Sequence, residues 1–133
     1  MTTYLLDADV LIALTVVEHE HHARASAWVT RVDRFALCPV VEGALVRFLV
    51  RVGESVSAAT QLLEAVHAMP RCEFWPDRLS YVDADLRNVR GHRQVTDAYL
   101  VRLAADREDA KLATLDEGLR QERPDVTLLV PPA

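Results

Sequence analysis

The sequence predicts an α/β fold in which a short, mostly parallel sheet is covered by helices on both faces. Three observations predict it. Short apolar segments with the length of buried strands alternate with longer segments of helical length, and turn-forming residues separate them. The chain has 133 residues, enough for one domain with a substantial core. We therefore expect residues 1–133 to form a single domain.

Five segments have the composition and flanks of short buried strands. Each is mostly apolar, and each is followed closely by Pro or by an acidic residue. The predicted strands are Thr3–Leu6, Phe35–Leu37, Cys72–Trp75, Leu112–Leu115 and Val126–Val130. Because strands that alternate with helices pair in parallel, a ligand is expected to bind beyond their carboxyl ends.

Helices are predicted between these strands. Ser55 and Thr96 are expected N-caps, and Gly53 and Gly91 are expected to end helices. Pro39 suits a first helical turn. The predicted helices are Val10–Val17, Glu18–Val32, Pro39–Val52, Ser55–Met69, Leu79–Val89, Thr96–Arg107 and a short helix capped by Asp116. Residues Glu18–Val32 form either a second helix or the continuation of the first.

The composition is that of an ordinary globular protein. Half of the residues are apolar and 26% are charged. No apolar run approaches the ~18 residues of a membrane helix, and no basic signal segment precedes the first strand, so we expect a cytoplasmic protein without a membrane partner. Cys38 and Cys72 have neither a zinc-site spacing nor the pattern of a disulfide framework. They are expected to be small core residues in a reducing compartment.

The net charge of −5 argues at first against a nucleic-acid partner, because phosphate binding usually requires a basic surface. The charges are unevenly placed, however. Basic residues lie just before Asp97 and just after Glu42. If clustered acids were neutralised by a metal, the remaining charge would be close to balance, so nucleic-acid binding is not excluded.

Four acidic residues lie where a predicted strand or loop passes into a helix: Asp7, Glu42, Asp97 and Asp116. Their neighbours are rich in Leu, Val and Ala, where a carboxylate without a partner is costly to desolvate. Taken singly, Asp97 and Asp116 are also explained as helix-start acids. If the fold brings all four together, a hard divalent cation is their natural partner, and such a site can activate water against a phosphodiester.

These segments resemble the PIN-domain ribonucleases, and more narrowly the VapC toxins of bacterial VapBC toxin–antitoxin pairs. The resemblance covers nearly the whole chain and rests on LLDADVLIAL, VVEGALVRFL, VTDAYLVRLA and LATLDEGL, with EHEHHARASAWV also similar. It implies a compact α/β/α sandwich that binds Mg²⁺ or Mn²⁺ and cleaves RNA. It further implies growth inhibition, a cognate VapB-type antitoxin and a homodimer.

Residue roles follow from the resemblance by position. The catalytic and metal-binding residues it implies are Asp7, Glu42, Asp97 and Asp116. Thr114 matches a hydroxyl position that supports the site. Asp9 departs from the pattern, which commonly has Asn or another small polar residue there. It is either a fifth ligand outside the inner coordination sphere or the cap of a helix that begins at Val10.

Several basic residues need a separate interpretation. His92 and Arg93 precede Asp97 and are candidates for contacting an RNA phosphate. The alternative is that they are basic residues exposed on a loop, which would give the same sequence pattern. The EHEHH segment, residues 18–22, suggests a metal cluster, but adjacent histidines point to different helix faces and hard cations do not favour imidazole. We expect His19, His21 and His22 to be solvated residues at a helix start.

Other classes of protein fit less well. A haloacid-dehalogenase-like phosphatase would explain DADV but needs a later Lys and an acid pair at spacings that the chain lacks. A receiver-type phosphoacceptor needs an Asp near mid-chain, and residues 43–72 contain none. A catalytically idle PIN-like module that binds RNA or protein is the main alternative.

Overall fold

A five-stranded parallel sheet forms the centre of the computed structural model, which describes residues 1–133. Its order is β3-β2-β1-β4-β5. The strands are β1 (Thr3–Leu6), β2 (Arg34–Leu37), β3 (Cys72–Phe74), β4 (Ala110–Thr114) and β5 (Thr127–Leu129). All five predicted strands are therefore confirmed, with shifts only at their ends.

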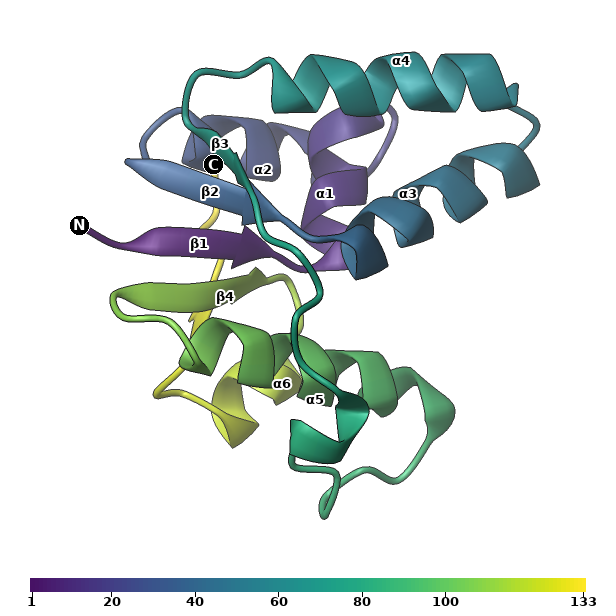
Figure 1. Ribbon diagram of the computed structural model, residues 1–133. Helices are drawn as coiled ribbons and strands as arrows, with labels where there is room; N and C mark the ends of the chain where they lie inside the picture. Colours follow the sequence, from purple (N-terminus) through teal and green to yellow (C-terminus); the bar gives the residue numbers. More distant parts are fainter.

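Helices cover both faces of this sheet. They are α1 (Ala8–Thr15), α2 (His22–Val29), α3 (Pro39–Arg51), α4 (Val56–His67), the 3₁₀ turn η1 (Tyr81–Asp83), α5 (His92–Ala105) and α6 (Glu117–Glu122). The chain steps from β1 to β3 in one direction and from β4 to β5 in the other, so right-handed crossovers place α1–α4 on one face and α5 and α6 on the opposite face. Figure 1 shows these two groups of helices. The predicted α/β/α arrangement is confirmed.

The helix predicted over Leu79–Val89 is wrong, because only the short η1 turn forms there. Hydrogen bonds to nearby side chains engage the backbone N–H groups of this segment instead. Ser80 and Asp83 form a reciprocal capping box, and Asp85 accepts a hydrogen bond from the backbone N–H of Arg87. Such bonds compete with helical ones and favour turns.

Two helix starts also differ from prediction. Thr96 is not an N-cap: α5 begins at His92, with Gly91 in the capping position and the Gln94 side chain accepting from the Arg90 backbone N–H. Asp97 therefore lies beyond the first turn of α5. The segment after α1 is not helical from Glu18, since α2 begins only at His22.

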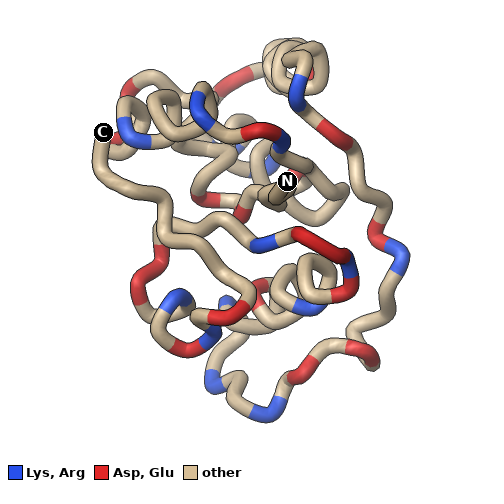
Figure 2. Tube along the Cα trace, turned by 90° about the vertical axis from the view of Figure 1, so that its left-hand side faces the viewer, with Lys and Arg blue, Asp and Glu red and all other residues tan.

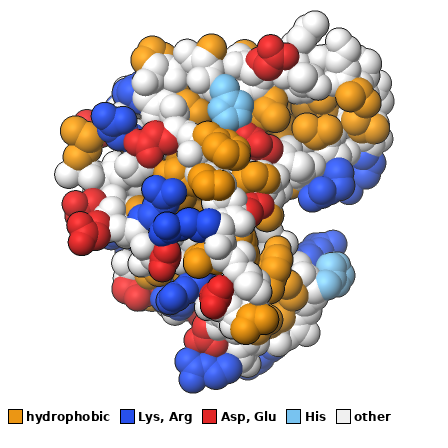
Figure 3. Space-filling view, viewed as in Figure 1, with side chains coloured by type: hydrophobic (Ala, Val, Ile, Leu, Met, Phe, Trp, Pro, Cys, Tyr) orange, Lys and Arg blue, Asp and Glu red, His pale blue; other side chains and the backbone are white.

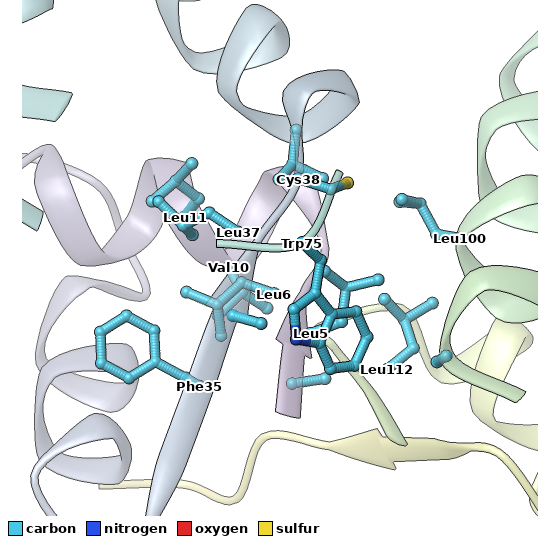
Figure 4. Packing of buried hydrophobic residues seen from close by; sticks show 14 of the residues in the cluster. Leu5, Leu6, Val10, Leu11, Phe35, Leu37, Cys38, Trp75, Leu100 and Leu112 are labelled. Atoms are coloured by element: carbon cyan, nitrogen blue, oxygen red, sulfur yellow. The ribbon is translucent and has the colours of Figure 1, made fainter. Parts of the chain in front are cut away.

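The core lies between the sheet and both helical layers. Leu5 and Leu6, neighbours in β1, are both fully buried, as expected for a parallel sheet covered on each face. Figure 4 shows side chains from β1, β2 and β4 packed against α1 and α5. Cys38 belongs to this core, Cys72 is half-buried, and both are free thiols, as expected. None of the helices combines the length and the apolar character needed to cross a bilayer.

Candidate active site

Three of the four predicted acids, Asp7, Asp97 and Asp116, gather at the carboxyl edge of the sheet, where the strand order changes direction. β1 and β4 are neighbours, but the chain leaves them for opposite sides of the sheet. Ligands of open α/β sheets bind at such a switch point. Asp7 directly follows β1, and Asp116 follows β4 by two residues, so topology alone brings them together.

Asp7 is a buried carboxylate with both oxygens engaged. Its side chain is 7% exposed; Oδ1 accepts a hydrogen bond from the Ala8 backbone N–H at 2.7 Å, and Oδ2 accepts one from the Thr114 hydroxyl at 2.9 Å. The first of these bonds makes Asp7 the N-cap of α1. The interpretation of Asp9 as the cap of a helix starting at Val10 is therefore wrong.

The acids are close enough to perturb one another. Burial is the main cause that raises the pKa of Asp7 to about 7, and the charges of Asp97 and Asp9 add to it, against the opposing Thr114 hydrogen bond. Burial also raises the pKa of Asp97 to about 6, with further contributions from Asp116 and Asp9. Asp7, Asp9, Asp97 and Asp116 thus form one cluster of negative charge without a Lys or Arg ion pair. A cation would relieve this repulsion.

Asp116 is held by the start of α6. Its Oδ1 accepts hydrogen bonds from the backbone N–H groups of Gly118 and Leu119, at 2.9 and 3.2 Å, and its other oxygen accepts none. Asp116 and Asp97 line a cleft of about 220 Å³ between α5, α6 and the segment that precedes α5. The N-cap role predicted for Asp116 is confirmed, and it leaves one oxygen available for a ligand.

Thr114 connects the ends of β1 and β4. It is fully buried, its hydroxyl donates to Asp7, and it accepts from the Asp116 backbone N–H at 3.0 Å. One side chain therefore fixes the position of two of the predicted site residues.

Replacing Thr114 by Val is expected to lower the free energy of unfolding by about 1–3 kcal/mol, because an apolar side chain of similar shape leaves the buried Asp7 carboxyl and the part-buried Asp116 N–H without these hydrogen bonds. Thr114→Ser keeps the hydroxyl and is the control. Urea unfolding of both variants at pH 7 measures the difference. Equal stability of the Val and Ser variants would contradict the bridging role.

Glu42 does not join the acidic cluster in this structure. Its carboxylate lies 2.5 Å from Nε2 of His67, at the end of α4, and the imidazole of His67 packs beside the Phe74 ring. No group of three His, Cys, Asp or Glu side chains is spaced to bind a single metal ion. Sequence reasoning missed His67, because it is 25 residues from Glu42 and only the packing of α4 on α3 brings it there.

The remaining predicted residues lie at the edges of the site. His92 and Arg93 are exposed in the first turn of α5. The histidines before α2 are not simply solvated, which corrects that expectation: Nδ1 of His22 hydrogen-bonds the Ala13 carbonyl at 2.8 Å, and Nδ1 of His19 accepts from the His21 backbone N–H. The first of these bonds ties α2 to α1, and the second lies within the segment that connects them.

A parallel α/β/α sandwich with clustered carboxylates at its switch point has the form of a metal-dependent nuclease, and comparison with known proteins agrees. A sequence model described as "PIN domain" matches residues 4–123. The chain belongs to the PIN-domain family, and within it to the VapC ribonucleases. Members of this family generally depend on a divalent metal.

The relatives of the chain support this assignment over most of its length. It is 53% identical to ribonuclease VapC29 of Mycobacterium tuberculosis over 130 residues, which cover 97% of both chains. It is 37% identical to ribonuclease VapC38 of the same organism, covering 90% of this chain and 92% of the relative. The predicted class, a VapC endoribonuclease, is confirmed, and the phosphatase alternative is excluded.

Solved structures show the same fold. The crystal structure of M. tuberculosis VapC20, described as a toxin that cleaves the sarcin-ricin loop, superimposes with a TM-score of 0.72 at 12% identity, covering 96% of this chain and 99% of that one. VapBC2 of Rickettsia felis, bound to a DNA fragment from its promoter, gives a TM-score of 0.67 at 12% identity and covers 96% and 98%.

Proposed function

We propose that the chain acts as a toxin that hydrolyses phosphodiester bonds of RNA at a site formed by Asp7, Glu42, Asp97 and Asp116, which together hold Mg²⁺ or Mn²⁺. The observation that carries this proposal is the convergence of Asp7, Asp97 and Asp116 from three separate elements, with the pKa of Asp7 and of Asp97 raised and with no Lys or Arg ion-paired to any of the three. Oxygen ligands of this kind suit a hard divalent cation. When bound, such a cation supplies an activated water and stabilises charge on the phosphate.

The chain's own residues orient this site. Thr114 and the start of α1 fix Asp7, and the first N–H groups of α6 fix Asp116. Glu42 would bind the metal once its contact with His67 is broken. Asp9, whose charge raises the pKa of both Asp7 and Asp97, is proposed as the ligand outside the inner coordination sphere.

Water rather than a side chain is the proposed nucleophile. Cys38 is the cysteine nearest this edge of the sheet in sequence, directly after β2, and burial raises the pKa of its thiol to about 12. Burial also raises the pKa of Cys72 to about 11. Both thiols are therefore protonated at neutral pH and poor nucleophiles.

Removal of divalent metal tests the proposal directly. Purified chain incubated with total bacterial RNA should cleave it with Mg²⁺ or Mn²⁺ and not with EDTA, and sequencing of the new RNA ends would locate the cut. Mg²⁺ should also raise the thermal unfolding temperature of the wild type but not of Asp97→Asn, because ligand binding stabilises only the folded state. Cleavage that persists in EDTA would contradict the metal-dependent mechanism.

We also propose a VapB-type antitoxin as the protein partner. An acidic site attracts an inserted Arg or Lys, which would compete with the metal for the same carboxylates. Antitoxin and Mn²⁺ bound together without competition would count against this mode of inhibition. The homodimer remains a prediction.

A further inference from the structure

Arg47, in the middle of α3, plays no part in holding the fold together. Its side chain is exposed, and its guanidinium has no ion pair and no hydrogen bond within the chain. Many other arginines do bond to carboxylates or backbone carbonyls: Arg24, Arg34, Arg71, Arg78, Arg87, Arg102 and Arg123. Arg47 is therefore a cation that is free to bind a ligand.

Gly43 makes room for this guanidinium. A Cβ on Gly43 would lie 3.2 Å from Nη1 and 3.9 Å from Cζ of Arg47, so the guanidinium occupies the space that a side chain at this position would take. Helical side chains lean toward the N-terminus of their helix, which is why Arg47 reaches back by four residues. Gly43 directly follows Glu42, and α3 begins where β2 ends. The charge of Arg47 is thus directed toward the end of α3 that adjoins the site.

The surface around the acids has two basic edges. Figure 3 shows a hollow between α3 and the beginning of α5, with Lys or Arg side chains over α3 on one edge and both Arg and His side chains over the start of α5 on the other. The basic residues of α3 are Arg47 and Arg51, and those of the first turn of α5 are His92 and Arg93. β1 and β4 end between these two helices (Figure 1).

We propose that Arg47, seated over Gly43, binds a backbone phosphate of the RNA substrate on the edge of the site opposite to His92 and Arg93. The inference rests on the proposed function of the acidic site. An unpaired guanidinium can bind two oxygens of one phosphate. It supplies attraction where the neighbouring carboxylates alone would repel RNA. Figure 2 shows that acidic and basic positions are interspersed along the chain.

Arg47→Gln tests this role through binding rather than cleavage. Affinity for a short fluorescein-labelled single-stranded RNA of mixed sequence is measured by anisotropy in EDTA, over a series of salt concentrations. Loss of one charged contact should weaken binding about ten-fold. The plot of log affinity against log salt should become less steep by about 0.7, the value for one phosphate contact on a single strand.

Arg31→Gln is the matched control. Arg31 is also exposed and without a side-chain partner, but it precedes β2 and so lies at the amino edge of the sheet, away from the acids. The substitution makes the same change in net charge. It should leave RNA affinity and the salt slope close to those of the wild type.

Gly43→Ala provides a second variant, which is expected to keep the fold intact. Ala favours a helix over Gly, so the melting temperature should hold or rise. The added Cβ displaces the Arg47 guanidinium and should reduce RNA affinity by a smaller factor than Arg47→Gln. In the Arg47→Gln background it should have no further effect, since the two residues act as one unit.

The outcomes are separable. Unchanged RNA affinity in Arg47→Gln, or an equal loss in Arg31→Gln, would overturn the inference and leave the proposed nuclease site standing. Unchanged RNA affinity with loss of antitoxin binding would overturn it in favour of a protein ligand. A wild-type chain that neither binds nor cleaves RNA would overturn the proposed function itself.

Discussion

Asp7→Asn is expected to reduce RNA cleavage by about a thousand-fold or more while leaving the fold intact. The large loss follows from removing a charged oxygen that is proposed to hold the metal and so to stabilise charge at the reacting phosphate. The fold survives because Asn caps helices as well as Asp does, so the bond from the Ala8 N–H is kept, and its amide can donate to the Thr114 hydroxyl.

The same substitution should make the metal-free chain more stable. Asp7 is 7% exposed and lies near the charges of Asp97 and Asp9, so ionising it in the folded state is unfavourable. A neutral amide avoids that cost, and we expect a gain of about 4 kcal/mol at pH 8 in EDTA. Gain of stability together with loss of activity is the signature of a functional site rather than of a structural residue.

Cleavage assays and urea unfolding of the same preparations check both halves of the prediction. Asp33→Asn is the matched control, since Asp33 is exposed, has no side-chain partner and precedes β2 at the opposite edge of the sheet. It should change neither quantity. An Asp7→Asn variant that retains a tenth or more of the cleavage rate would remove Asp7 from the catalytic site.

Without metal, the free energy of unfolding should fall as the pH rises from about 4 to about 7. The Asp7 carboxyl has its ordinary pKa of 3.8 when the chain is unfolded, whereas its pKa in the folded chain is about 7. Between these values the folded state keeps a proton that the unfolded state has lost, so each rise in pH favours unfolding. Below this range the group is neutral in both states, and above it the contribution is constant.

The expected total from Asp7 is about 4 kcal/mol, and Asp97, whose pKa is raised to about 6, acts in the same direction. Other carboxyl groups also titrate in this range, so the difference between wild type and Asp7→Asn isolates the contribution of Asp7. That difference should grow from pH 4 to pH 7 in EDTA. Mg²⁺ should reduce it at pH 8, and a difference that does not change with pH would refute the assigned burial and repulsion.

The fold was predictable because its signals are local. Each strand is a short apolar run with Pro or an acid close behind it, and neither face of the sheet needs polar residues because both are covered. The predicted helix over Leu79–Val89 failed for an equally local reason, since Ser80 and Asp83 bond to the backbone and hold a turn. Helix propensity does not show whether the backbone N–H groups of this segment bond to side chains or to helical carbonyls.

The sequence by itself determined the strands, the fold class, the family and the acids that follow β1 and β4. Tertiary structure alone decided how the side chains around them pair. In the folded chain Asp7, rather than Asp9, caps α1, and Asp7 hydrogen-bonds to Thr114, which is 107 positions away in the sequence. Glu42 pairs with His67, and Arg47 has no ion pair and lies beside Gly43. Apolar patterning specifies which residues are buried in each element. Which charged groups pair depends on the distances between side chains on different elements, and these distances are set only when the layers pack together.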